Sequence, residues 1–208
     1  MDIKQRITDI VRDKNTQIPT LPVVVDNVLN AAKDDRTSAK DLARFISNDQ
    51  AIANKILRLA NSAYYGMIKE IDSISRAITV IGFNEVVSIT IGMSTINAFQ
   101  EKDFHGVLDI KDLWMHSICC AMMTRQIAKN TGKGQPEQYF LTGLLHDMGK
   151  VVFAIYLPEE YAEVLKEAKE SGTPLFRKEK EMMGIDHAGL TGILMERWSF
   201  PDSLVYPS

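Results

Sequence analysis

A histidine and an aspartate, His146 and Asp147, stand side by side in an otherwise apolar segment that runs from Leu141 to Lys150. A neutral imidazole and a carboxylate are both good ligands for a divalent transition ion. An ion held by this pair could activate water for attack on a phosphate, and Lys150 could neutralise a phosphoryl oxygen. Whether the pair holds a metal therefore decides whether the sequence describes an enzyme.

Two further histidines could join the pair, His116 upstream and His187 downstream. A lone histidine on an apolar helix is more often a hydrogen-bonded core residue than a ligand, so two interpretations stay open. In one, His116, His146 and Asp147 hold a metal. In the other, they form a polar network that seals the junction between helices. Both interpretations predict that the three side chains converge.

The helices that carry these residues can be outlined from hydrophobic spacing. One continuous helix is expected to begin at Pro136 and to run past the pair to about Ile155, so that His146 and Lys150 share a face and Asp147 projects about 100° round from His146. The helix with His116 is expected over about residues 109–129. It is apolar on more than one face, which predicts a central, mostly buried helix.

The only two cysteines, Cys119 and Cys120, fall on that helix. We expect them to be small buried residues of a reduced, cytoplasmic protein and not a disulfide. The net charge of −3 and the absence of a basic recognition helix argue against DNA as a partner. The longest apolar run, residues 151–157, is far shorter than the roughly 20 residues of a membrane helix, which argues against a membrane.

The first half of the chain is predicted to be a bundle of short helices. The alternation of apolar and polar residues that indicates a β-strand does not persist anywhere in it. An amphipathic helix is expected near the N-terminus, and Ser38 with Asp41 is typical of a capping box. Ser47, Asn48 and Asp49 are candidate caps for the next helix. Farther along, Lys55 and Arg58 beside Tyr64 and Tyr65 could bind an anion or an aromatic ligand, although such a charged face is usually only solvated.

Taken in order, the motifs of the chain resemble the HDOD domain, an HD-related output domain of bacterial signalling proteins. The resemblance covers about residue 18 to the end. It implies an all-α fold of two parts, an N-terminal short-helix bundle over residues 18–100 packed on an HD-like helical bundle over residues 101–208, preceded by a separate helix in residues 1–17. HDOD relatives commonly continue farther, so the resemblance implies a domain truncated at its C-terminus. The motifs are Ile18 to Pro22, Asp49 to Gly66, Ser73 to Gly82, Leu113 to Ser117, Thr142 to Lys150, Gly184 to His187 and Trp198 to Pro201.

The resemblance also bears on the metal. The HD superfamily of metal-dependent phosphohydrolases uses an upstream histidine, a His-Asp pair and a later aspartate, and His116, His146 and Asp147 match the first three. His187 is similar to the next histidine of the cyclic-di-GMP phosphodiesterase (HD-GYP) subgroup. The paired histidines and final carboxylate of a complete two-metal site have no counterpart in this sequence.

We therefore expect a non-catalytic bacterial signal-transduction module that acts through protein or nucleotide binding, with signalling proteins as partners and no required cofactor. In it the metal-type residues are vestigial. The alternative is a metal-dependent phosphohydrolase acting on a nucleotide or cyclic dinucleotide. That enzyme would hold a divalent metal at His116, His146 and Asp147, with His187 as a weaker ligand and Lys150 as its catalytic residue.

Overall fold

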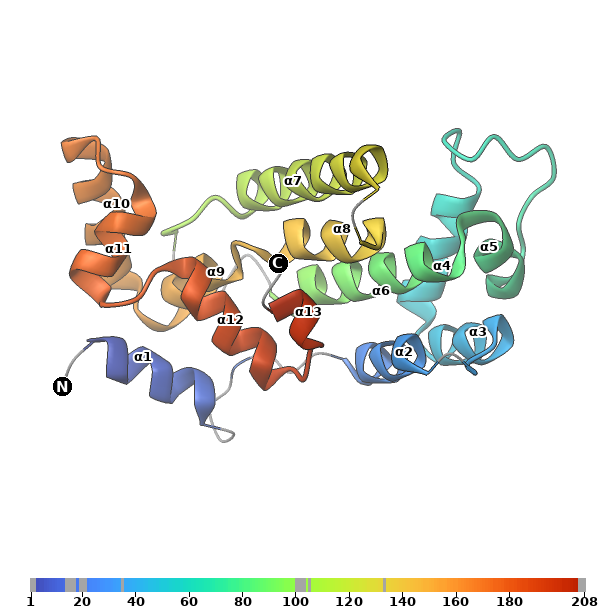
Figure 1. Ribbon diagram of the computed structural model, residues 1–208, viewed down its shortest axis with the longest axis horizontal. Coiled ribbons are helices and arrows are strands. Elements are labelled where there is room, and N and C mark those ends of the chain that lie inside the picture. Colours follow the sequence, from blue (N-terminus) through green and yellow to red (C-terminus); the bar gives the residue numbers. More distant parts are fainter. Residues whose placement is uncertain are drawn as a thin grey trace. The chain divides into compact units, whose positions relative to one another are not determined.

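The computed structural model describes residues 3–13, 18, 22–34, 36–99, 104, 106–132 and 134–205. Within these ranges every regular element is a helix, which confirms the all-α class (Figure 1). The contacts among residues divide the chain into two compact units. One is Leu21–Ala98, and the other combines Met1–Thr20 with Phe99–Ser208.

The unit Leu21–Ala98 has a core of aliphatic side chains contributed by all of its helices. Its central helix, α6, contacts α2, α4 and α5, while α3 contacts α2, α4 and α5. The expected capping box forms at the start of α3, where Ser38 accepts from the backbone of Asp41 and the Asp41 side chain accepts from the backbone of Ser38. The helices are α2 (Val23–Lys33), α3 (Ala39–Ser47), α4 (Gln50–Ala60), α5 (Ile74–Ile81) and α6 (Phe83–Ala98).

The second unit starts with the predicted N-terminal helix, α1, which packs against α12 through the fully buried Ile7 and Val11. Arg197 of α12 strengthens this contact, because its guanidinium donates to the Val11 carbonyl at 2.7 Å. The helices of this unit are α1 (Ile3–Arg12), α7 (Ile110–Thr131), α8 (Pro136–Leu145), α9 (Met148–Tyr156), α10 (Pro158–Ser171), α11 (Leu175–Met183), α12 (His187–Arg197) and α13 (Asp202–Val205).

Helix α7 runs antiparallel to α8, and its exposure contradicts the expectation of a buried central helix (Figure 1). Apart from Ile110 in its first turn, its buried residues are small, Ser117, Ala121 and Ala128, and they let α8 approach closely. On its other side Met115 and Met122 are 64% and 54% exposed. The prediction failed because apolar residues all round a helix indicate burial only if helices pack on every side, and among the described residues none covers the outer face. The two cysteines, predicted to be buried, are exposed at Cys119 and half-buried at Cys120.

The predicted continuous helix around the His-Asp pair is also wrong, because it is broken there into α8 and α9. The cause lies in α12, which crosses at the break. Thr191 Oγ accepts from the Gly149 N–H at 2.8 Å, and it lies 3.1 Å from the His146 carbonyl oxygen and 2.8 Å from that of His187. A side chain at Gly149 would overlap the His187 carbonyl, so only glycine admits this crossing.

No single helix in the described ranges is long and apolar enough to span a membrane. Helices α5 and α6 reach that length and hydropathy only when they are taken together, and they are bent by 112° at their junction. Many of their apolar side chains are buried in the helical unit, including Ala77, Ile78, Val86 and Ile91.

Candidate metal centre

Four side chains from three segments of the chain converge at the break between α8 and α9. His116 comes from α7, His146 and Asp147 form the break itself, and His187 begins α12. The carboxylate of Asp147 is at the centre, with its side chain only 3% exposed. His146 Nε2 and His187 Nε2 lie 3.4 and 3.5 Å from Asp147 Oδ1, and His116 Nε2 lies 3.6 Å from Oδ2. The expected convergence is present, and His187 is part of it.

Lys150 occupies the remaining side of the carboxylate. Its ammonium group donates to Asp147 Oδ2 at 2.6 Å, and its side chain is largely buried. The sequence predicted that Lys150 would share a face with His146, but the helix break moves it onto Asp147 instead. The carboxylate therefore already has one positive charge in direct contact.

The hydrogen bonds of His146 define its proton position. Its Nδ1 lies 2.8 Å from the carbonyl oxygen of Gly143, which can only accept, so Nδ1 carries the proton. Burial lowers the pKa of His146 below its ordinary value, although the charge of Asp147 opposes that shift. Near neutral pH the ring is therefore neutral, and its Nε2 presents a lone pair towards Asp147 Oδ1.

His187 is oriented in the same way by a buried carboxylate, Glu179 of α11. Glu179 Oε2 accepts from His187 Nδ1 at 2.5 Å and from the His187 backbone N–H at 2.9 Å. The other oxygen accepts from the Tyr161 hydroxyl at 2.9 Å. Burial, and then the charge of Glu179, raise the pKa of Tyr161, so its hydroxyl remains a donor. A carboxylate behind an imidazole is the usual support of a metal-ligating histidine.

These residues fit a divalent metal. Asp147 Oδ1 is buried without a hydrogen-bond partner among the described residues, although imidazole nitrogens surround it. The separations of 3.4 to 3.6 Å are long for hydrogen bonds. Two nitrogen or oxygen ligands of one tetrahedral zinc ion lie about 3.4 Å apart, given bonds of roughly 2.0–2.2 Å. A cation between the carboxylate and the Nε2 atoms of His146 and His187 would satisfy all three groups.

Sequence reasoning missed several residues that build this site. Cys120 is one, with Sγ 3.6 Å from His116 Nε2. Its position one turn after His116 on the same helix was a visible signal. Glu179 stands in a run of alternating charges that resembles a solvated surface, so nothing in the sequence singles it out. Thr191 was equally inconspicuous, because it acts on backbone groups of a distant segment.

The residues of the alternative site in the first half of the chain contact different partners. Lys55 donates to Asn97 Oδ1 at 2.9 Å, and the Tyr65 hydroxyl donates to Glu85 at 3.2 Å. Tyr64 packs edge-on against Tyr65 with ring centroids 4.9 Å apart, and it is largely exposed. The structure thus directs Lys55 and Tyr65 away from a common ligand.

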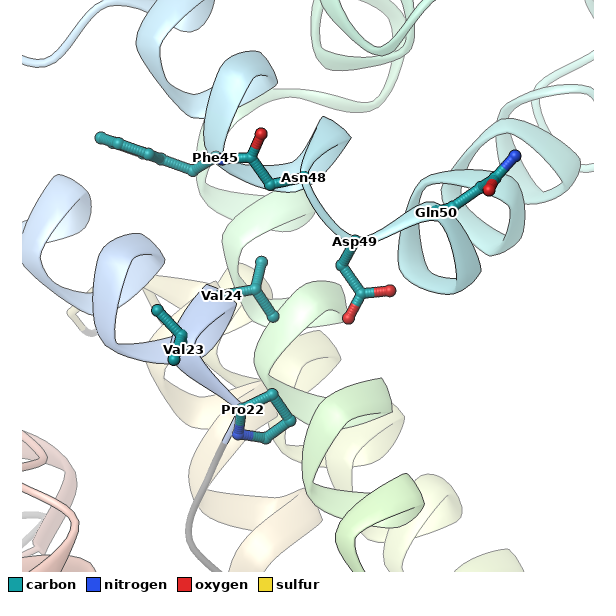
Figure 2. Close-up of a pocket in the computed structure, with 7 residues that line it drawn as sticks. All are labelled: Pro22, Val23, Val24, Phe45, Asn48, Asp49 and Gln50. Carbon is teal, nitrogen blue, oxygen red and sulfur yellow. The ribbon is translucent and has the colours of Figure 1, made fainter.

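The unit Leu21–Ala98 also contains an open pocket of about 350 Å³ between the start of α2 and the junction of α3 and α4. Figure 2 shows the Asp49 carboxylate beside this space, with Phe45 and Gln50 pointing away from it. Asp49 Oδ1 accepts from the Ile52 N–H at 3.0 Å, so the carboxylate serves as a helix cap. The lining residues include neither histidine nor cysteine; they are Pro22, Val23, Val24, Phe45, Asn48, Asp49 and Gln50.

Solved structures share this fold over nearly the whole chain. A proposed phosphohydrolase from Shewanella amazonensis is 25% identical with a TM-score of 0.79, and the match covers 98% of this chain and 69% of that protein. An HDOD domain protein of unknown function from Geobacter sulfurreducens gives the same identity and TM-score over 98% and 68%. A proposed signal transduction protein from Marinobacter aquaeolei has a TM-score of 0.77 at 20% identity, covering 98% and 48%, and so shares the fold.

Curated relatives are similar over much of this chain but are considerably longer. An uncharacterized protein of Treponema pallidum is 26% identical over 196 residues, which is 94% of this chain and 37% of that protein. The uncharacterized protein YuxH of Bacillus subtilis is 25% identical over 146 residues, or 66% and 35%. The chain thus spans little more than a third of the length of these relatives. The model of the HDOD domain matches residues 18–207, and the chain therefore belongs to the HDOD family.

Proposed function

We propose that this protein is a non-catalytic signal-transduction module that acts by binding a protein or a nucleotide. One observation carries the proposal, the contact of 2.6 Å between the Lys150 ammonium and Asp147 Oδ2. An internal cation already neutralises Asp147, the one carboxylate in the described part of the chain that faces all three imidazoles. The carboxylate, the lysine and the histidines therefore form a polar core network that positions helices without a hydrolytic ion.

The shortage of anionic ligands supports the same proposal. Glu179 is a second acidic side chain close to the histidines, and both of its oxygens are engaged, by Tyr161 on one side and by His187 on the other. A catalytic ion that activates water at a phosphate usually has several carboxylate or histidine ligands and an open position. At this place the described residues offer three histidines but a single carboxylate facing them all, and Lys150 shares that carboxylate.

A metal-dependent phosphohydrolase acting on a nucleotide or cyclic dinucleotide is the second candidate. Asp147 Oδ1, which has no hydrogen-bond partner among the described residues and faces Nε2 of His146 and of His187, favours this function, as does the name of the Shewanella relative. A divalent ion held by His116, His146, Asp147 and His187 would supply a hydroxide nucleophile at neutral pH. For Lys150 to neutralise a phosphoryl oxygen, its ammonium would have to leave Asp147.

The partners that we propose are signalling proteins in the cytoplasm, with a cyclic dinucleotide as the candidate small ligand and neither DNA nor a membrane involved. The free Cys119 and Cys120 are in keeping with a reducing compartment. The experiment is to incubate protein purified without chelators with cyclic di-GMP, and to measure binding by calorimetry and linear product by chromatography. We expect no product. Product that disappears in His146→Ala would replace the regulatory proposal with the hydrolase.

A further inference from the structure

Three potential metal ligands lie together on the solvent side of Asp147. They are His116 and Cys120, one turn apart on α7, and His146 at the end of α8. Their ligating atoms all lie within 4.8 Å of one another. Two of the three donors, His116 and His146, also face Asp147, but the sulfur of Cys120 has no part in the network around the carboxylate.

The distance between the first two donors is that of two ligands on one ion. A zinc–imidazole bond of about 2.05 Å and a zinc–thiolate bond of about 2.3 Å, joined at a tetrahedral angle, place the nitrogen and the sulfur about 3.6 Å apart. Cys120 Sγ lies 3.6 Å from His116 Nε2. A tetrahedral ion could therefore bind both atoms with little adjustment of α7.

Charge explains why a thiolate would be needed at this place. Anionic ligands strengthen the binding of a dication, and Asp147 Oδ2 is already bound by Lys150 at 2.6 Å. An ion close to Oδ2 would also be repelled by that ammonium. Asp147 Oδ1, buried and without a hydrogen-bond partner among the described residues, lies 3.4 Å from His146 Nε2 and marks the inner side of the ligand cluster. A second negative charge can come from the outer side, where Cys120 is the ligating residue.

We propose that His116, Cys120 and His146 bind a zinc ion, with Cys120 as its thiolate ligand. On binding, the Cys120 thiol loses its proton to solvent and sulfur donates an electron pair to the metal. A soft thiolate combined with imidazoles selects zinc over manganese or magnesium. The proposal is independent of the non-catalytic assignment, because an ion in this position could regulate the module or serve a reaction.

The scaffold holds the three ligands in place and leaves a route for the ion. His116 and Cys120 lie on the same rigid helix, and the hydrogen bond from His146 Nδ1 to Gly143 directs the opposite nitrogen to the cluster. The His116 side chain is 55% exposed and Cys120 is half-buried, so an ion can arrive from solvent. Cys119, which directly precedes Cys120 in the chain, is exposed and is not part of the cluster of ligands. It is therefore a matched control.

The test is to titrate the full chain with Co²⁺ and to record its absorption spectrum, because a thiolate bound to Co²⁺ gives a near-ultraviolet charge-transfer band. The native protein and Cys119→Ser are expected to show this band, and zinc should abolish it by displacing cobalt. Cys120→Ser and Cys120→Ala are expected to lack it. Zinc affinity should fall roughly 100-fold in both variants, about the share of one ligand in a structural zinc site.

Each other outcome overturns the proposal. If cobalt binds but the charge-transfer band is missing, the ion has only nitrogen and oxygen ligands. Such an ion would lie between Asp147 Oδ1 and the imidazoles, without Cys120. A band that also disappears in Cys119→Ser would assign the site to both cysteines, and no binding at all would exclude the site. Circular dichroism and thermal melts of the variants without metal, expected to match the native protein, ensure that a lost band reports a lost ligand. Turnover of cyclic di-GMP would count against the regulatory proposal and leave the zinc proposal unaffected.

Discussion

Two helix junctions in this protein have an aspartate at the same position and use it differently. At the junction of α3 and α4, the residue before the helix is Asp49, and its side chain accepts from the Ile52 N–H as an ordinary N-cap. At the junction of α8 and α9 the residue is Asp147, which makes no side-chain cap at all. Its carboxylate turns instead to Lys150 and to the imidazoles of three segments.

The difference has a structural cause in α12. Thr191 accepts from the N–H of Gly149, the second residue of α9, which is the bond that an N-cap side chain usually makes. A residue of another helix thus caps α9 and releases Asp147 for the site. The comparison teaches that the same residue type before a helix can serve as its cap or be free for a site, depending on whether a neighbouring helix supplies the cap.

The largest effect is expected for Gly149→Ala, which tests the crossing that makes the second junction possible. The added methyl would overlap the His187 carbonyl, a backbone atom that cannot move aside. We expect a loss of about 3 kcal/mol or more in the free energy of unfolding, measured by urea titration. Gly192→Ala is the control, because Val205 Cγ1, at 4.0 Å, is the nearest atom to the added methyl. An equal loss in both variants would contradict the account.

The same substitution at the two aspartates should have unequal effects. Asparagine caps helices as well as aspartate does, so Asp49→Asn is expected to change stability by less than about 0.5 kcal/mol. Asp147→Asn leaves Lys150 without its buried anion and should cost about 2–3 kcal/mol. Thermal melts would show a fall of several degrees for the second variant alone. Similar melts for the two would mean that Asp147 contributes no more to stability than the helix cap Asp49 does.

Removing the distant cap should have an intermediate effect. Thr191→Val keeps the shape of the side chain but leaves the buried N–H of Gly149 unpaired, for which we expect about 1–2 kcal/mol. Asp49→Ala, which removes a cap from its own helix, should cost about 1 kcal/mol. Denaturant titrations at one pH compare the two. If Thr191→Val were neutral, α9 would not depend on α12 for its cap.

The smallest expected effect is a dependence of the free energy of unfolding on pH, and it arises at the junction of α8 and α9. The pKa of His146 is lowered in the folded state, so the unfolded chain binds a proton more readily there. The stabilisation that comes from the uncharged His146 ring is present in full above the pKa of about 6.5 that histidine has in the unfolded chain. It is lost as the pH falls through the lower pKa of His146 in the folded protein. Urea titrations of metal-free protein between pH 7.5 and 5 should show this loss, and His146→Asn should show less of it. An unchanged slope in the variant would assign the loss to other groups.

Sequence alone was informative where a local rule decides the structure. The helical class, the capping box at Ser38 and the convergence of His116, His146 and Asp147 followed from spacing and from the family resemblance. The break between α8 and α9 could not be predicted, because Leu141 to Ile155 keeps helical periodicity throughout and Thr191 interrupts it from another part of the chain. Glu179 and the exposure of α7 were missed for a related reason, since both depend on which helices become neighbours.

The central claim is that Asp147 and its imidazoles, with Lys150 in contact, do not hydrolyse phosphodiesters. The most direct measurement is the release of nitrophenol from bis(4-nitrophenyl) phosphate by protein loaded in turn with Mn²⁺, Fe²⁺ and Zn²⁺, next to His146→Ala treated in the same way. The account predicts that native protein and variant release nitrophenol at the same background rate with every ion. Metal-dependent release by the native protein that the variant lacks would contradict it.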